Sequence, residues 1–200
     1  MFIKNFKAVK NRDILKKLES YMTLNRKKDN EVIEEIVSND SSITNKDFTY
    51  GSTPYNTVKG LISTIEKKPE RFVVFGASIG WMCFYWNEMF PDIETVGVDL
   101  HTGRVEFGNE LIKEHGLSNI KLVTDNVFNF KLEDTDLLWQ SNLCFENKVA
   151  EKLTNSIIDN YPEIAIISYK PIFYTRKYVK RHYFPVSWME KQPFFTYEKI

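Results

Sequence analysis

Residues 71–80 read RFVVFGASIG, an apolar run followed by a turn with two glycines. The run 71–75 predicts a short buried strand, and residues 81–90 predict a buried helix directly after the turn. In an open parallel sheet, a strand, turn and helix of this kind bring backbone N–H groups close to a ligand at the helix N-terminus. The stretch therefore predicts a ligand-binding loop in an α/β fold.

Strand and helix patterns alternate on both sides of this stretch. Helices are predicted at 54–67, 102–115 and around Leu153, and strands at 94–98, 120–123, 137–139 and 164–167. Because strands that alternate with helices form parallel sheets covered on both faces, the predicted fold class is α/β with a mostly parallel, Rossmann-like sheet. After Ser168 the pattern changes, and residues 183–188 and 194–200 predict an antiparallel hairpin that closes the sheet edge.

The first 48 residues differ from the rest in being polar and helical. Apolar residues share a helical face in two groups, which are Ile14, Leu15 and Leu18, and then Val32, Ile33, Ile36 and Val37. Residues 39–46 (NDSSITNK) are typical of a loop. We expect an N-terminal helical appendage over residues 1–48 and a single domain over residues 49–200.

Composition excludes several classes of protein. The chain has 200 residues, 42% of them hydrophobic, and a formal net charge of zero, which excludes a disordered chain. Cys83 and Cys144 are the only cysteines, and with three histidines they predict neither a disulfide framework nor a Cys/His metal site. The central charge-free run, 72–87, has 16 residues, fewer than the roughly 20 of a membrane-spanning helix. With no secretory signal at residues 1–12, we expect an intracellular protein, cytoplasmic or nuclear.

Basic residues are concentrated in two stretches. Residues 1–28 hold nine Lys or Arg against two acidic residues, and residues 164–189 hold five against none. Such segregation fits an anionic partner such as nucleic acid. It is also typical of a solvated face without a partner.

Two glycines and an aspartate form the main candidate site. Asp99 lies 19 positions after Gly80 and ends the second predicted strand, where a carboxylate can accept both ribose hydroxyls of an adenosine. Taken separately, Gly76 and Gly80 also fit a tight turn, and Asp99 also fits the N-cap of a helix.

Residues 76–80 also match G-x-S-x-G, the nucleophile elbow of serine hydrolases. In that alternative Ser78 is the nucleophile, and Asp136 and His182 are the later acid and base. The elbow does not account for Asp99. A nicotinamide-binding loop fits less well, because G-x-G-x-x-G needs a glycine where Ser78 stands.

Six segments, in order, resemble the disruptor-of-telomeric-silencing family, the non-SET histone lysine methyltransferases. Residues 50–55 (YGSTPY) resemble Y-G-E-T-S-F, residues 72–80 resemble F-V-D-L-G-S-G-V-G, and residues 97–99 (GVD) resemble G-V-E. Residues 140–145 (QSNLCF) are similar to V-N-N-F-A-F, residues 168–171 (SYKP) to S-S-K-P, and residues 186–188 (VSW) to V-S-W. The resemblance covers residues 49–200.

This resemblance implies a class I methyltransferase fold that uses S-adenosylmethionine to methylate a lysine ε-amine of a histone or another protein. It implies catalytic residues around a lysine channel at Tyr50, Asn142 and Trp188. The implied cofactor-binding residues are Thr53, the loop positions Gly76, Ser78 and Gly80, then Asp99 on the ribose, and Asn126 and Val127 beside the adenine. No metal is implied.

The chain departs from the family pattern at two positions that bear on cofactor binding. Val74 stands where the family has an acidic residue, which removes a polar partner of the methionine end. Ser78 replaces the middle loop glycine, so its side chain either crowds the ligand or forces a different backbone angle. Three alternatives therefore stay open: a non-catalytic binding module, a nucleic-acid methyltransferase and a small-molecule methyltransferase. The nucleic-acid alternative lacks its usual N-P-P-Y motif, since residues 141–145 contain no proline.

Overall fold

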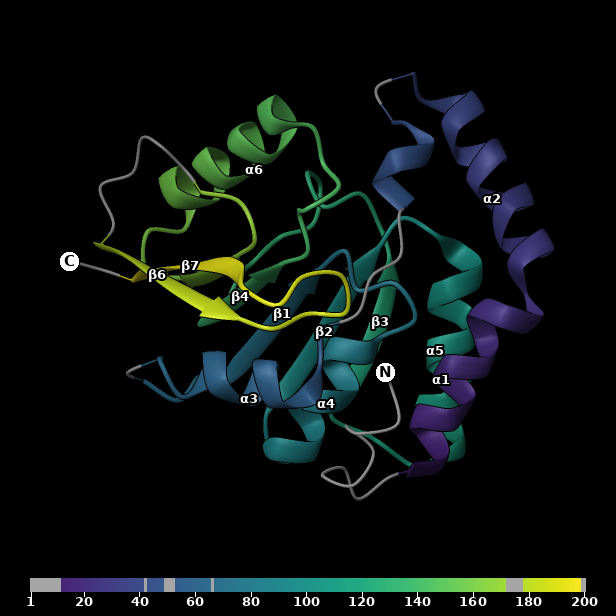
Figure 1. The fold of residues 1–200 in the computed structure, drawn as a ribbon, viewed down its shortest axis with the longest axis horizontal. Coiled ribbons are helices and arrows are strands. Elements are labelled where there is room, and N and C mark those ends of the chain that lie inside the picture. Colours follow the sequence, from purple (N-terminus) through teal and green to yellow (C-terminus); the bar gives the residue numbers. More distant parts are fainter. Residues whose placement is uncertain (1–11, 42, 49–52, 66, 172–177, 199–200) are drawn as a thin grey trace.

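A seven-stranded sheet forms the centre of the computed structural model, which describes residues 12–41, 43–48, 53–65, 67–171 and 178–198 (Figure 1). The strand order is β3-β2-β1-β4-β5-β7-β6. The strands are β1 (Arg71–Phe75), β2 (Glu94–Asp99), β3 (Ile120–Thr124), β4 (Leu137–Gln140), β5 (Ala165–Ser168), β6 (Tyr178–Phe184) and β7 (Gln192–Glu198). The first five are parallel, whereas β7 is antiparallel to β5 and β6 is antiparallel to β7. The predicted α/β sheet with an antiparallel C-terminal pair is confirmed.

Helices cover both faces of this sheet. They are α1 (Arg12–Leu24), α2 (Arg26–Asn39), α3 (Tyr55–Ile62), α4 (Trp81–Met89), α5 (Thr102–Glu114) and α6 (Asn147–Asn160). Figure 1 shows α6 on one side of the sheet and α3 and α4 on the other. Because successive strand residues point to opposite faces, Phe72 and Val74 of β1 join the core beneath α3 and α4, and Val73 and Phe75 join the core beneath α6.

The described part of residues 1–48 is helical, as predicted, and it packs against α5. The rings of Tyr21 in α1 and Phe107 in α5 lie 4.4 Å apart, centroid to centroid. Leu18 is fully buried in the core that α3 and α4 share. A 3-10 turn, η2 (Asn45–Phe48), lies partly within the predicted loop. The domain boundary at residue 48 stays a prediction.

The helix predicted at 54–67 is shorter than expected. It ends at Ile62, and the hydroxyl of the next residue, Ser63, donates to the carbonyl of Gly60 at 2.6 Å. Serine and threonine side chains compete for backbone groups in this way, and they favour turns over further helix.

The strand predicted at 183–188 is also wrong in its bounds, because β6 stops at Phe184. Pro185 has no N–H to give to the ladder, and the N–H of Val186 donates to the carbonyl of Met189 at 2.8 Å, within the turn that leads to β7. The hairpin exists, but its first strand begins and ends earlier.

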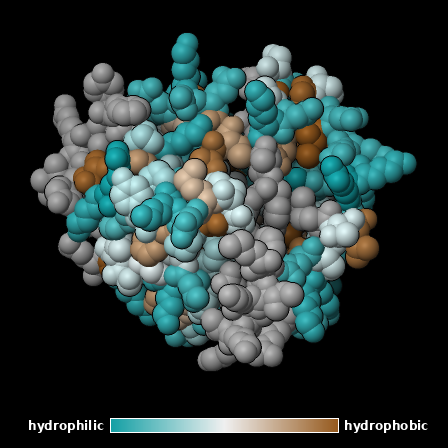
Figure 2. All heavy atoms as spheres, viewed as in Figure 1, coloured by the Kyte–Doolittle hydropathy of each residue, from teal (hydrophilic) through white to brown (hydrophobic). Residues whose placement is uncertain are grey.

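Hydrophilic and apolar side chains are interspersed on the surface in the same view. Figure 2 shows groups of hydrophilic side chains on this face, with small apolar groups between them. Within the described ranges, no helix has both the length and the apolar character needed to cross a membrane.

Candidate functional site

A pocket of about 830 Å³ opens at the carboxyl ends of β1, β2 and β4. Seven of the predicted site residues line it: Thr53, Gly76, Ser78, Asp99, Asn126, Val127 and Trp188. Gly80 and Asn142 are not among its lining residues. Tyr50 lies outside the described residues, as do residues 1–11 and 172–177 of the two basic stretches.

The loop after β1 has the tight geometry that its glycines predict. Three of its residues have a positive φ: Gly76 (+73°), Ser78 (+51°) and Gly80 (+91°). The N–H groups of Gly76 and Ala77 both donate to the carbonyl of Val98, at 2.9 and 3.1 Å. Ser78 therefore adopts the left-handed angle that favours glycine, at a cost of roughly 1–2 kcal/mol for a residue with a Cβ.

Asp99, at the end of β2, holds this loop through its carboxylate. Its Oδ2 accepts the Ser78 N–H at 2.7 Å, and its Oδ1 accepts the His101 N–H at 2.9 Å. The N-cap of α5 is His101, whose side chain accepts the Arg104 N–H at 3.2 Å. The alternative in which Asp99 is a helix N-cap is therefore wrong.

The loop after β3 forms another wall of the pocket. The N–H of Asp125 donates to the Asp99 carbonyl at 3.1 Å, and the carboxylate of Asp125 accepts the Asn126 N–H at 2.7 Å. The side-chain oxygen of Asn126 accepts the Phe128 N–H at 3.0 Å. Asp125 and Phe128 line the pocket but are absent from the predicted site. Asp125 directly follows β3, and an acidic residue two positions after the strand predicted at 120–123 is a signal that could have indicated it.

Aromatic rings line the pocket beside α4 and the β6–β7 turn. The ring centroids of Trp81 and Tyr85, both on α4, are 5.8 Å apart. The ring centroids of Tyr169, which follows β5, and Trp188, which follows β6, are 6.2 Å apart. The hydroxyl of Tyr169 is hydrogen-bonded to that of Thr53. Burial raises the pKa of Tyr85 and of Tyr169, so both phenols stay neutral at ordinary pH. Trp188 is 41% exposed, which places it at the solvent side of this wall.

Asn142 lies in a buried polar network next to the pocket. Its amide donates to the Ser168 hydroxyl at 2.9 Å and to the Gln140 side chain at 3.3 Å, and its oxygen accepts the Lys170 N–H at 3.3 Å. These bonds fix the strand ends of β4 and β5 relative to each other. Its contact with a ligand stays a prediction.

The structure does not assemble the hydrolase alternative. Asp136 accepts the N–H groups of Glu70 and Arg71, at 2.8 and 3.0 Å, at the start of β1. Ser78 follows the other end of β1, and a strand of five residues is roughly 17 Å long. The ring of His182 is bonded to Thr196 of β7 at 3.1 Å. The three residues cannot act together as a triad.

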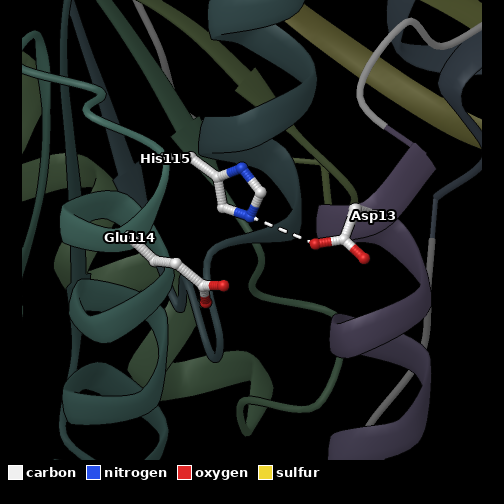
Figure 3. Close-up of side chains that lie close together, drawn as sticks. All are labelled: Asp13, Glu114 and His115. Atoms are coloured by element: carbon white, nitrogen blue, oxygen red, sulfur yellow. Dashed lines mark ion pairs between the residues drawn. The ribbon is translucent and has the colours of Figure 1, made fainter.

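Among the described residues, one group of side chains has metal-ligand chemistry. Figure 3 shows Asp13 of α1 facing His115 and Glu114 at the end of α5. His115 Nε2 lies 3.5 Å from the Asp13 carboxylate. The ammonium of Lys17 forms an ion pair with Asp13 at 3.3 Å and another with Glu114. Both carboxylates therefore already have a positively charged side chain as a partner. We interpret the cluster as an ion-pair network that joins α1 to α5.

Comparisons with known proteins support the fold of this chain. No family model matches the chain, and no curated protein matches it. Neither comparison supports the resemblance to the non-SET lysine methyltransferases, which stays a prediction.

Solved methyltransferase structures are similar to this chain at low identity. An RNA methyltransferase from Salinibacter ruber, in complex with S-adenosyl-L-homocysteine, matches with a TM-score of 0.56 and 11% identity, over 73% of this chain and 90% of that chain. A precorrin-6y C5,15-methyltransferase from Geobacter metallireducens matches with a TM-score of 0.54 and 11% identity, over 72% and 88%. Coclaurine N-methyltransferase matches with a TM-score of 0.48 and 11% identity over 63% of this chain, which spans only 36% of that longer protein. The first two likenesses confirm the predicted class I methyltransferase fold.

Proposed function

We propose that this protein binds S-adenosylmethionine in the pocket beside Asp99 and methylates an acceptor amine. The observation that carries the proposal is the position of the Asp99 carboxylate. It accepts the Ser78 N–H of loop 76–80, in which three residues have a positive φ, at the carboxyl edge of the sheet. This edge is where open α/β sheets bind their ligands. A structure of the same fold contains S-adenosyl-L-homocysteine.

The residues of the pocket fit this cofactor. Each oxygen of Asp99 accepts one N–H group and has a second lone pair for a ribose hydroxyl. Ser78 and Trp81 line the pocket, and their Oγ and Nε1 atoms are buried behind its surface with no hydrogen-bond partner among the described residues. Leaving such groups unpaired costs about 1–3 kcal/mol each, so a small shift of either side chain toward a polar ligand would be favourable. A volume of about 830 Å³ lies within the range of cofactor sites.

In this proposal each wall has a separate task. Asp99 holds the ribose, and Asn126 and Val127 flank the adenine. When bound, S-adenosylmethionine supplies a methyl group activated by its sulfonium. Ser78 and Trp81 line the wall that we assign to the polar end of the same ligand.

We further propose a lysine ε-amine of a protein as the acceptor. An amine must be uncharged to attack a methyl group, and a wall of neutral aromatic side chains disfavours the charged ammonium. Trp81, Tyr85, Tyr169 and Trp188 form such a wall. Because Trp188 is partly exposed, a long side chain from another protein can reach this wall from solvent.

Two measurements test the proposal. Calorimetric titration with S-adenosylmethionine and S-adenosyl-L-homocysteine tests the cofactor, and mass spectrometry after incubation with labelled cofactor, histones, a protein lysate, RNA and small amines tests the acceptor. Methyl-lysine on a protein supports the full proposal. Methyl transfer only to RNA or a small molecule contradicts the lysine acceptor. Binding without any transfer indicates a non-catalytic module, and the absence of binding overturns the proposal as a whole.

A further inference from the structure

A continuous series of hydrogen bonds joins α2 to the loop after β1. The Ser78 N–H donates to one oxygen of Asp99, and the His101 N–H donates to the other, at 2.7 and 2.9 Å. The Asp99 carboxylate is thus held at both oxygens, and His101 supplies one of the two contacts. The side chain of His101 continues the series toward α2.

The imidazole of His101 is fully buried and uses both ring nitrogens. Its Nδ1 accepts the Arg104 N–H at 3.2 Å, so this nitrogen carries no proton. Its Nε2 lies 3.1 Å from the backbone carbonyl of Asp29 and 3.1 Å from the Asp29 carboxylate. Both of these oxygens accept hydrogen bonds, so Nε2 carries the proton and the ring is the neutral Nε2–H tautomer.

Asp29, on α2, is itself locked in place. It is 4% exposed, and the guanidinium of Arg104 binds its carboxylate at 2.6 and 3.0 Å. Burial raises the pKa of Asp29, but the hydrogen bonds of His101 and Arg104 and the charge of Arg104 outweigh it and hold this pKa well below its usual range. The same Arg104 lines the pocket beside Asp99. A charged, fixed anchor on α2 therefore orients the His101 ring.

We propose that His101 is a positioning residue for Asp99 and that α2 holds it through Asp29, so the N-terminal helices are part of the cofactor-binding unit. A carboxylate that is already oriented loses less entropy when it binds a ligand. The inference rests on the proposed function for the identity of the ligand. A purely structural role for His101 predicts a different result, in which only stability changes.

The main test is His101→Asn, with the affinity for S-adenosyl-L-homocysteine measured by calorimetry at a temperature where the variant is fully folded. Asparagine keeps an N-cap acceptor for the Arg104 N–H but is too short to reach Asp29. We expect affinity to fall about tenfold, as when a group that orients a binding residue is removed. Tyr21→Phe is the matched control, since it removes a long contact to the Asp29 carboxylate, at 3.4 Å, and leaves in place every hydrogen bond that links Asp29, His101, Asp99 and Ser78. Its affinity should stay within about twofold of wild type.

A double-mutant cycle with Asp99→Ala tests the route of the effect. If His101 acts through Asp99, His101→Asn should cause no further loss of affinity in the Asp99→Ala background. An equal loss in both backgrounds overturns the inference, and so does an unchanged affinity in a His101→Asn protein of lower stability. Asp29→Asn, which keeps the shape of the side chain, is the second variant if His101→Asn does not fold, and a smaller loss in the same direction is expected.

Amide hydrogen exchange in the ligand-free protein separates this inference from the proposed function. His101→Asn should make the Ser78 N–H exchange faster, because the backbone N–H of residue 101 that holds the other oxygen of Asp99 is then no longer anchored to α2 through the ring. Faster exchange supports the positioning role even if wild type binds no S-adenosyl-L-homocysteine, a result that overturns only the proposed function. Unchanged exchange at Ser78 overturns the positioning role.

Discussion

Asp99 accepts the backbone N–H of Ser78 at 2.7 Å, although 21 residues separate them in the chain. This bond joins the end of β2 to the loop after β1, so the carboxylate and the loop form one rigid edge of the pocket. Both residues face the same space. The free-energy cost of the positive φ at Ser78 is thus offset by the hydrogen bond from its N–H to a charged carboxylate, because a charge-assisted bond is stronger than a neutral one.

Asp99→Ala should weaken the binding of S-adenosyl-L-homocysteine by about 1.5–3 kcal/mol, the range for a hydrogen bond to a charged group. The variant loses the ribose acceptor and also frees the Ser78 N–H. Calorimetry measures the effect, and Asp92→Ala, an exposed acid before β2, is the matched control. Equal dissociation constants for wild type and a folded Asp99→Ala protein would contradict the assignment.

Ser78→Gly should raise stability by about 1 kcal/mol, because glycine adopts a positive φ without the Cβ penalty. For a chain of this size, that change raises the melting temperature by about 2–4 °C. Ser78→Ala is the control, since it also removes the unpartnered hydroxyl but keeps the Cβ. A glycine variant no more stable than the alanine variant would show that the loop is not strained.

Local patterns in the sequence were sufficient for the sheet and for one side of the site. The apolar run 71–75, the two glycines after it and an acid at the end of the next strand predict the arrangement around Asp99, because all of it follows from strand ends meeting at one edge. Strand alternation in β1 likewise assigns Val73 and Val74 to opposite cores.

The rest of the site depends on contacts that no local pattern encodes. His101 meets Asp29 across 72 residues, and the sequence shows only a polar residue near a helix start and another within a polar helix. Tyr169 and Trp81 each look like core residues, since an aromatic side chain in an apolar context has the same signature in a pocket wall as in a core. Their roles depend on the crossing of separate elements, which periodicity does not determine.

The Asp29 carboxylate should make stability depend on pH in the acid range. Its pKa is lowered in the folded protein, so its contribution is fully present above its unfolded pKa of about 3.9 and is lost as pH falls below that value. Urea unfolding at pH 7, 5, 4 and 3 should show wild type more stable than Asp29→Asn at neutral pH, with the difference narrowing below about pH 4. The same difference at pH 3 and pH 7 would contradict the prediction that the ionised carboxylate of Asp29 is the source of this stability.

Trp188→Ala should leave the binding of S-adenosyl-L-homocysteine within about twofold of wild type but lower the rate of lysine methylation by about 10- to 100-fold, since misalignment of a reacting group costs rates of this order. Trp188 lines the pocket from the β6–β7 turn, and its indole N–H donates to Gln192 at 3.3 Å, so the ring is held at the solvent side of the aromatic wall. Its loss admits water to the acceptor amine, which favours the charged ammonium and loosens the alignment of the amine.

The matched control is Met189→Ala, because Met189 is the next residue, is 49% exposed and does not line the pocket. Methylation rates should be measured at saturating cofactor on whichever protein acquires methyl-lysine. If both variants lose the same activity, the turn acts only as a scaffold, and if Trp188→Ala loses cofactor affinity instead of rate, Trp188 belongs to the cofactor side of the pocket.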